Sequence, residues 1–360
     1  MDMKPKKIAI LCNYELLPNR VGGMDYFFWQ FDKKCKENNI QIDWFFPNEA
    51  SFGNYKELNN INTSNQNVEV FFVKYCESST QNYDFVFTHF VELCTSNFKK
   101  IKTITNARII AVDHNPRPIN GYSFKKKLVK KVKGFLYSKY IDLFVGVSHY
   151  TVKEIIKDFG NIVKPKTIMI YNGVTIYKIK ERTNRDFRNP KFLVASHLRE
   201  SKGIQDLINS VGLLSLKLKN QIKIDIYGDG LYKEILINLI NEKKLENCFN
   251  FLGSKSNLNE IFCNYDYMLQ PTHMECFSLS ILESLAANVP VITTNVGGNE
   301  EVITHLENGI IFRAKSTDEL AKILKEILLQ EIKIVKNTRI FIENNFSLEN
   351  MVNNYLTLLQ

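Results

Sequence analysis

Short, continuously apolar segments recur along this chain, each followed by a stretch long enough for a helix. This alternation restricts the fold more than any other feature of the sequence. The strands predicted in the first half are KIAILC from Lys7, IDWFF from Ile42, VEVFFV from Val68, DFVFTH from Asp84, RIIAVD from Arg108, DLFVGV from Asp142 and TIMIY from Thr167. Most lack the apolar–polar alternation of a sheet with one wet face, so we expect a parallel sheet covered by helices on both sides.

A polar, charged segment that ends in proline, residues 178–190, interrupts this series and is predicted to be a linker. The second series of predicted strands is KFLVAS from Lys191, IKIDIYG from Ile222, FNFLG from Phe249, DYMLQ from Asp266 and VPVITT from Val289. The sequence therefore predicts an α/β protein of two doubly wound parallel-sheet domains, residues 1–177 and 191–346, with a C-terminal helix over 347–360. The cleft that two such domains face is the expected ligand position.

Composition narrows the possible partners. The formal net charge of +9 favours an anionic partner such as a nucleotide, a nucleic acid or an anionic membrane. The seven cysteines form no C-x-x-C pair, which is typical of reduced thiols in a cytoplasm. The apolar run after Lys7 resembles a weak signal peptide, but Asn13 and Glu15 interrupt it early, so a buried first strand is the better interpretation. No apolar stretch is long enough to span a bilayer.

Two carboxylates lie eight positions apart in ECFSLSILESLAANVPVITTNVGG, which begins at Glu275. Glu275 follows a predicted strand, and Glu283 lies one turn inside a predicted helix that Ser278 or Ser280 can cap. Considered alone, Glu275 is best interpreted as a solvent-exposed acid in a loop. Considered alone, Glu283 is best interpreted as the second member of a capping box, Ser280-x-x-Glu283. Taken together, two carboxylates can accept hydrogen bonds from sugar hydroxyls, while the free N–H groups of the helix start can hold a phosphate. A second capping box, Ser316 to Glu319, predicts a helix through about Leu329.

A lysine-rich segment, SFKKKLVKKVKGFLYSKY from Ser123, is predicted to form an amphipathic helix with six lysines between Lys125 and Lys133. An apolar stripe on one face would consist of Phe124, Leu128, Val132 and Phe135. The segment can be a solvated surface helix of the first domain or an interfacial helix on an anionic leaflet. The second interpretation is favoured, since each lysine near such a surface contributes about 1 kcal/mol.

The E-x7-E spacing followed by PVITTNVGG resembles the signature of retaining GT-B glycosyltransferases of family four, the glycosyl transferases group one. Further stretches agree in order along nearly the whole chain: Gly22-Gly23, VGVSHYTVKEI, IYNGV, VASHLRESKGIQDLI, IYGDG, FLGSKSNLNEIF and DYMLQPTHMECF. The resemblance implies a GT-B fold whose C-terminal helix crosses back to the first domain. It also implies transfer of a sugar with retention from a UDP- or GDP-linked donor to an acceptor hydroxyl.

The resemblance also implies roles for individual residues. Glu283 should bind the nucleotide ribose, Glu275 the donor sugar, and Lys202 the diphosphate, with Glu275, Lys202 and His114 as the catalytic set. His197 stands where the family usually has an arginine, and Arg199 can substitute for it. The remaining implied substrate contacts are Gly22, Gly23, Gly228, Phe277, Ser278 and Leu279. His89 is a weaker candidate than His114, because a histidine after a strand is often only packed.

We expect no cofactor and no metal ion, because the chain contains no D-x-D motif. The leaving phosphate oxygen would take the acceptor proton, so no protein nucleophile is needed. The expected acceptor is a lipid-linked saccharide in cell-surface glycan synthesis, such as O-antigen or capsule, at the inner face of the cytoplasmic membrane. The alternatives are a nucleotide-sugar epimerase or hydrolase on the same scaffold and, more remotely, an NAD-dependent oxidoreductase, whose G-x-G-x-x-G has Lys233 in place of its third glycine. A nucleic-acid binder is disfavoured, because no known module or aromatic-rich basic face is present.

Overall fold

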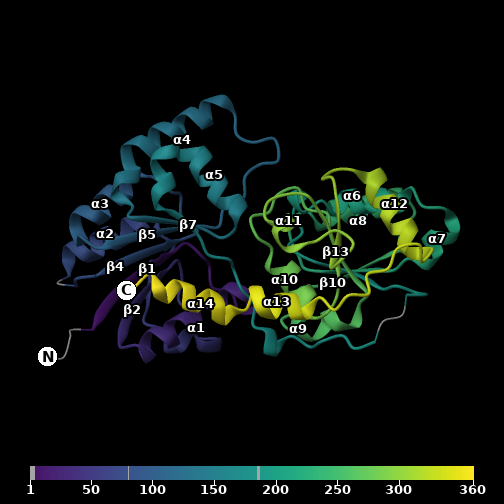
Figure 1. Ribbon diagram of the computed structural model, residues 1–360, viewed down its shortest axis with the longest axis horizontal. Coiled ribbons are helices and arrows are strands. Elements are labelled where there is room, and N and C mark those ends of the chain that lie inside the picture. Colours follow the sequence, from purple (N-terminus) through teal and green to yellow (C-terminus); the bar gives the residue numbers. More distant parts are fainter. Residues whose placement is uncertain (1–4, 80, 185–186) are drawn as a thin grey trace. The chain divides into compact units, whose positions relative to one another are not determined.

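The protein is described by a computed structural model over residues 5–79, 81–184 and 187–360 (Figure 1). It divides into two compact units. Unit 1 holds the described residues up to Asn172 together with Glu349–Gln360, and unit 2 holds Gly173–Leu348. The predicted linker 178–190 includes residues 185 and 186, which lie outside the described residues, so its boundaries stay a prediction.

The described strands of unit 1 form a parallel sheet in the order β3-β2-β1-β4-β5-β6-β7. The strands between the two edge strands are mostly buried because their sequences are apolar and both faces of the sheet are covered, whereas the edge strands, residues 60–62 and 167–169, are only partly buried. The strands are β1 (Lys6–Cys12), β2 (Ile40–Phe46), β3 (Asn60–Asn62), β4 (Phe85–His89), β5 (Arg108–Asp113), β6 (Leu143–Gly146) and β7 (Thr167–Met169).

Helices cover both faces of this sheet. On one face α2 (Val68–Ser78), α3 (Ser96–Thr105) and α5 (His149–Phe159) share a buried cluster with the strands, and α4 (Phe124–Tyr137) packs on α5. On the other face lie α1 (Gly23–Glu37) and the C-terminal helix α14 (Leu348–Thr357), which run side by side in Figure 1. The Tyr355 ring of α14 lies 5.0 Å from Phe27 of α1 and 6.3 Å from Phe87 of β4. The C-terminal helix therefore completes the core of unit 1, which confirms the expected return.

The predicted strand VEVFFV is wrong, because these residues begin helix α2. The Asn67 side chain caps this helix by accepting a hydrogen bond from the Val70 N–H at 2.9 Å. Val68 and Phe72, four residues apart, then face the core together. A short apolar run cannot be assigned to strand or helix by periodicity alone, and the cap decides here. The strands β3 and β13 were not predicted.

In unit 2 the described strands form a second parallel sheet in the order β10-β9-β8-β11-β12-β13. One buried cluster joins the strands to α6, α8 and α12, while α10 and α13 contact each other. The strands are β8 (Phe192–Ala195), β9 (Ile224–Tyr227), β10 (Phe249–Gly253), β11 (Tyr267–Gln270), β12 (Val291–Thr294) and β13 (Gly309–Phe312). The helices are α6 (Ile204–Gly212), α7 (Leu216–Gln221), α8 (Lys233–Glu242), α9 (Leu258–Ile261), α10 (Leu279–Ala286), α11 (Asn299–Val302), α12 (Thr317–Leu328) and α13 (Arg339–Asn345).

Short 3-10 helices connect several of these elements. They are η1 (Pro18–Arg20), η2 (Gly53–Glu57), η3 (Ser138–Tyr140), η4 (Asn161–Lys166), η5 (Ile176–Lys178), η6 (Glu200–Lys202) and η7 (Phe262–Asn264).

Neither predicted capping box forms. Ser316 precedes α12 as expected but makes no capping bond with its side chain. The Glu319 carboxylate instead accepts a hydrogen bond from the Arg313 N–H at 2.8 Å. At α10 the cap is Ser278, whose hydroxyl accepts from the Ile281 N–H, so Ser280 lies inside the helix. Glu283 is therefore not engaged in capping.

Candidate active site

Loops from adjacent strands of unit 2 converge at the carboxyl ends of β8, β9, β11 and β12, where ligands of parallel sheets bind. The loop after β8 carries His197 and Arg199 and leads into η6, which ends at Lys202. The loop after β11 carries Glu275 and leads into α10. These two loops are tied together by their backbones, because the His273 N–H donates to the Ser201 carbonyl at 2.7 Å.

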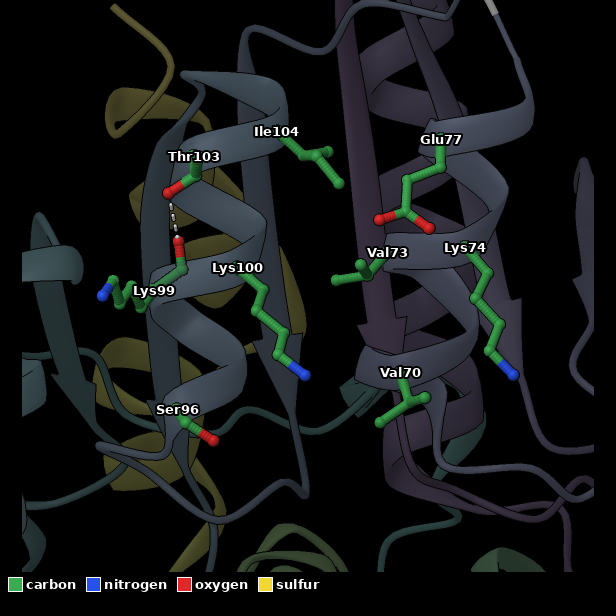
Figure 2. A pocket seen from close by; sticks show the side chains of 9 residues that line it. All are labelled: Val70, Val73, Lys74, Glu77, Ser96, Lys99, Lys100, Thr103 and Ile104. Atoms are coloured by element: carbon green, nitrogen blue, oxygen red, sulfur yellow. Dashed lines mark hydrogen bonds between the residues drawn. The ribbon is translucent and has the colours of Figure 1, made fainter.

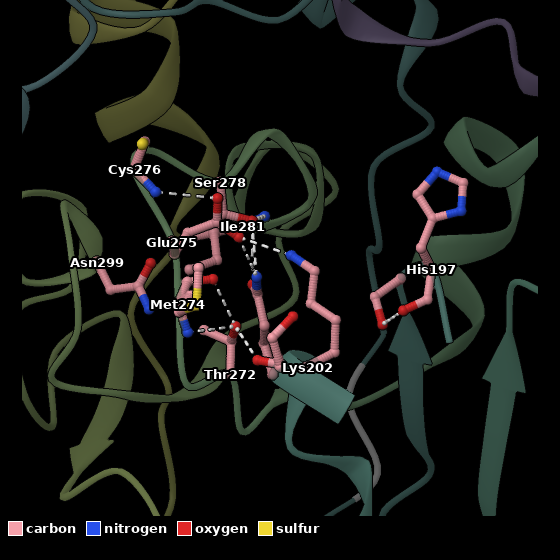
Figure 3. A network of polar contacts seen from close by, with 12 residues as sticks. His197, Lys202, Thr272, Met274, Glu275, Cys276, Ser278, Ile281 and Asn299 are labelled. Atoms are coloured by element: carbon pink, nitrogen blue, oxygen red, sulfur yellow. Dashed lines mark hydrogen bonds and ion pairs between the residues drawn. The ribbon is translucent and has the colours of Figure 1, made fainter. Parts of the chain in front are cut away.

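Lys202 and Glu275 form the centre of this cluster. The Lys202 ammonium lies 2.9 Å from the Glu275 carboxylate, and both side chains are largely buried. Figure 3 shows them extending toward each other from the two loops. Gln270, the last residue of β11, donates to the same carboxylate at 3.3 Å and to the Ser278 hydroxyl at 2.9 Å. One hydrogen-bonded group therefore joins the strand end, both loops and the helix cap.

The N-terminus of α10 lies directly beside this group. Phe277 and Ser278 are buried, and Leu279 is the first helical residue, so its N–H is among those without a partner inside the helix. Glu283 lies one turn further on. Burial raises the pKa of its carboxyl to about 7. Among the described contacts this carboxylate has neither a hydrogen-bond donor nor a cation, which makes it available to hydroxyl groups of a ligand.

Two glycines let the loops approach this closely. Gly297 has a φ of +62°, and a Cβ there would lie 1.9 Å from the Glu275 carbonyl oxygen. Gly228, in the turn after β9, has a φ of +132°, and its Cβ would lie 1.9 Å from the Ser196 carbonyl oxygen. Any side chain at either position would displace the loop that carries Glu275 or His197.

His197 and Arg199 are both exposed on the loop after β8. In Figure 3 His197 stands to the side of the Lys202–Glu275 group. The choice between them as the phosphate-binding residue therefore stays a proposal.

In unit 1 the predicted residues also gather at the carboxyl ends of neighbouring strands. Gly22 caps α1, and its N–H donates to the Asp25 carboxylate at 2.9 Å. The Tyr14 hydroxyl donates to the same carboxylate at 3.1 Å, and its ring lies 5.4 Å from Phe90. Phe90 in turn stacks on His114 at 4.2 Å. The structure thus links Gly22 and His114 through one chain of contacts, and Gly23 is the first residue of α1.

Two contributors to these clusters, Asp25 and Gln270, were missed in the sequence, and a third, His89, was named there only as a weaker candidate. Asp25 is buried, accepts from Gly22, Tyr14 and Tyr55, and has a pKa that burial raises despite those bonds. Gln270 bridges Glu275 and Ser278, and His89 contacts His114. A polar residue at the carboxyl end of an apolar parallel strand was the available signal for Gln270.

Other features lie apart from these clusters. A pocket of about 610 Å³ lies between α2 and α3, lined by Val70, Val73, Ile104 and the lysines 74, 99 and 100 among others (Figure 2). No predicted site residue lines it. In the parts of the chain that the structure describes, no group of three or more His, Cys, Asp or Glu side chains could hold a metal ion. Over the same residues, no helix is both long and apolar enough to cross a membrane.

Solved structures share this architecture. Anabaena Alr3699/HepE, crystallised in complex with UDP, superposes with a TM-score of 0.76 over 98% of this chain and 99% of that one, at 18% identity. Two Rossmann-like units with parallel sheets in one chain define the class: the protein has the GT-B fold.

Sequence comparison then gives the family. Residues 176–347 match the family model described as glycosyl transferases group 1. N-acetyl-alpha-D-glucosaminyl L-malate synthase of Bacillus anthracis is 28% identical over 231 residues, which are 60% of this chain and 59% of that protein. The capsular polysaccharide biosynthesis glycosyltransferase CapM of Staphylococcus aureus is 27% identical over 290 residues, 69% of this chain and 73% of CapM. Residues 176–347 therefore resemble the glycosyl transferases group 1, and the chain spans less than two thirds of the length of the Bacillus relative.

Proposed function

We propose that this protein is a glycosyltransferase that moves a sugar, with retention, from a UDP- or GDP-linked donor to an acceptor hydroxyl. The observation that carries the proposal is the group formed by Lys202, Glu275 and the capped start of α10, with Glu283, which has no partner among the described contacts, one turn away. A cation, helix N–H groups and two carboxylates are the partners that a diphosphate, a sugar and a ribose require. HepE, of the same fold, was crystallised with UDP and with UDP-glucose.

In this mechanism the protein positions the reactants and stabilises charge on the leaving group. Lys202 exchanges Glu275 for the diphosphate, and Glu275 then accepts hydroxyl groups of the donor sugar. The leaving phosphate oxygen takes the proton of the acceptor hydroxyl on the same face of the sugar. The positive end of α10 and the Lys202 ammonium act on the oxygens where negative charge develops. His114 belongs to the acceptor side, in unit 1.

The acceptor that we propose is a lipid-linked saccharide at an anionic membrane surface, and helix α4 supports this. Its apolar stripe is exposed, with Phe124 at 83% and Phe135 at 72%, and Leu128 and Val132 about half exposed. Among the described residues of α4 only Gly134 is buried. Gly134 seats the helix on α5, since a Cβ there would lie 2.2 Å from the Phe159 carbonyl oxygen. A helix that leaves its apolar stripe outside is suited to an interface.

The lysines of α4 fall into two groups. Lys130 pairs with Asp158 at 3.1 Å, Lys133 pairs with Glu92 at 2.7 Å, and Lys126 lies over the Tyr122 ring. Lys125, Lys127 and Lys131 are exposed and have no acidic partner among the described contacts. These three flank the apolar stripe, and an anionic lipid surface complements both features. The site of action that we propose is therefore the inner face of the cytoplasmic membrane.

A donor screen tests the proposed activity. Purified protein would be mixed with each of the common UDP- and GDP-sugars, and the shift in melting temperature would be measured beside that caused by NADH and NADPH. Donors that bind would then be incubated with lipid extracts, and the products identified by mass spectrometry. Transfer to a lipid-linked glycan supports the proposal. Conversion of the donor without an acceptor would favour an epimerase or hydrolase, and stabilisation by a nicotinamide cofactor alone would favour an oxidoreductase.

A further inference from the structure

Two histidines in unit 1 form a directly bonded pair. His89 ends β4, and His114 follows the neighbouring parallel strand β5. The Nδ1 atom of His89 lies 3.0 Å from the Nε2 atom of His114, within hydrogen-bond distance. The two rings are tilted by 31° with centroids 5.3 Å apart, so the contact is made through these nitrogens rather than by stacking.

The surroundings keep both rings uncharged. His89 is 1% exposed and is enclosed by the rings of Phe27, Phe28 and Tyr355, at 6.0 to 6.3 Å. This burial lowers its pKa well below the ordinary value. His114 is covered by Phe90, and burial lowers its pKa to about 4. Both imidazoles are therefore neutral near pH 7.

The other ionisable groups around the pair do not reverse this. Asp113 raises the pKa of His114 but is itself held by Arg117 at 2.6 Å. Cys12, in register with His89 on β1, and Tyr355 on α14 both have pKa values raised by burial, so they are neutral too. No carboxylate among the described contacts bonds to either imidazole.

A neutral imidazole has one N–H donor and one acceptor nitrogen. When two neutral rings share one hydrogen bond, one must donate and the other accept, so each tautomer dictates the other. We propose that His89 is a positioning residue that holds His114 in a single neutral tautomer and leaves Nδ1 of His114 as the nitrogen that meets substrate. The single tautomer of His114 is a property of the free protein. Only the contact between Nδ1 of His114 and a substrate rests on the proposed function.

The direct test is a long-range ¹H–¹⁵N correlation spectrum of protein labelled at histidine, recorded near pH 7, which reports the proton on each ring nitrogen. The wild-type protein should show His114 as one neutral tautomer. His89→Asn keeps an amide group where Nδ1 stands and should preserve that tautomer. His89→Gln places its amide where Nε2 stands and, like His89→Leu, should give a mixture of tautomers. A wild-type spectrum with His114 charged or already mixed would overturn the proposal even if no variant folds.

Turnover supplies the second measurement, with the donor found in the screen above. His89→Leu and His89→Gln should lower kcat by about 10- to 100-fold, part of the roughly 10²–10⁴ that a positioned acid or base contributes. The KM for the donor should stay unchanged, and His89→Asn should recover most of kcat. A purely structural role for His89 would lower the melting temperature without altering the tautomer of His114, which would contradict the proposal. If the wild-type protein turns over no nucleotide-sugar, the proposed function fails, while the spectrum still decides the tautomer lock.

Discussion

The carboxyl of Glu283 has a higher pKa than that of a surface glutamate, and this difference affects both stability and ligand binding. Its folded pKa of about 7 lies above the ordinary value, so the folded state holds the proton more tightly than the unfolded chain. The resulting stability is fully present below the unfolded pKa and is lost as the pH rises through about 7. In the ligand-free protein this loss should amount to about 1–2 kcal/mol, after allowance for partial exposure.

Glu283→Gln should therefore have two opposite effects. The ligand-free variant should be more stable than the wild-type protein near pH 8 and equally stable only below the unfolded pKa, at about pH 4, measured by denaturant unfolding. Its affinity for UDP or GDP should fall by about 10- to 100-fold, because each charge-assisted bond to ribose contributes roughly 1.5–3 kcal/mol. Glu242→Gln, at an exposed site on α8, is the matched control and should change neither quantity. Undiminished nucleotide affinity would remove Glu283 from the site.

Lys202 should act on the leaving diphosphate. Lys202→Ala should raise the KM for the donor and lower kcat by roughly 10²–10³, the scale of losing one group that faces developing charge. Lys202→Arg keeps the charge and should retain much more activity. Because Lys202 supplies this charge, turnover should also persist in excess EDTA. Complete loss of turnover that Mg²⁺ or Mn²⁺ restores, or an unchanged kcat/KM in Lys202→Ala, would contradict the assignment.

At the scale of elements, substitutions on α4 should change membrane binding without changing the stability of the protein. Replacing Lys125, Lys127 and Lys131 by Gln should weaken co-sedimentation with anionic liposomes by about 100-fold, since each lysine contributes about 1 kcal/mol. Binding of the wild-type protein should weaken with rising salt, because the attraction fades within about 8 Å at physiological ionic strength. The melting temperature and UDP affinity should not change, because these side chains lie outside the core.

The control for α4 is the same charge change in unit 2. Lys217, Lys243 and Lys255 are exposed there, and their replacement by Gln should leave liposome binding intact. Equal binding of the wild-type protein to neutral and anionic vesicles would indicate a hydrophobic mode instead. Absence of binding to either would identify α4 as an ordinary solvated helix.

Elements were predicted where one local signal was sufficient. The continuous apolar runs of β1, β4 and β5 identified buried parallel strands, and SLSILESLA identified α10. Prediction failed where a local signal had two meanings, as with α2, or where a side chain had a nearer partner than the cap, as with Glu319. In the candidate site, Glu275 and Glu283 were predicted from their spacing and Lys202 from the family resemblance, and their roles stay predictions. The bridges made by Gln270 and His89 were not predicted, because each joins residues brought together only by the fold of the sheet.

At the scale of the whole molecule, substitution of Tyr355 tests how much the stability of unit 1 depends on the C-terminal helix α14. Its ring packs on Phe27, Phe31 and Phe87, so Tyr355→Ala should destabilise the protein by about 3–5 kcal/mol. Its hydroxyl is buried without a partner among the described residues, and leaving such a group unsatisfied costs about 1–3 kcal/mol. Tyr355→Phe should therefore be neutral or stabilising in denaturant unfolding. A marked loss of stability in Tyr355→Phe would reveal a bond to this hydroxyl.

The return of α14 to unit 1 also affects the order of events on the ribosome. Asn172 and Glu349 both belong to unit 1, yet the whole of unit 2 is translated between them. At about 5–20 residues per second this delay is on the order of 10–40 s. Throughout that time the nascent α1 face, rich in phenylalanine, lacks its cover and is open to chaperones or to aggregation. Unit 2, being continuous in sequence, can fold first, although it is the second half of the chain to be made.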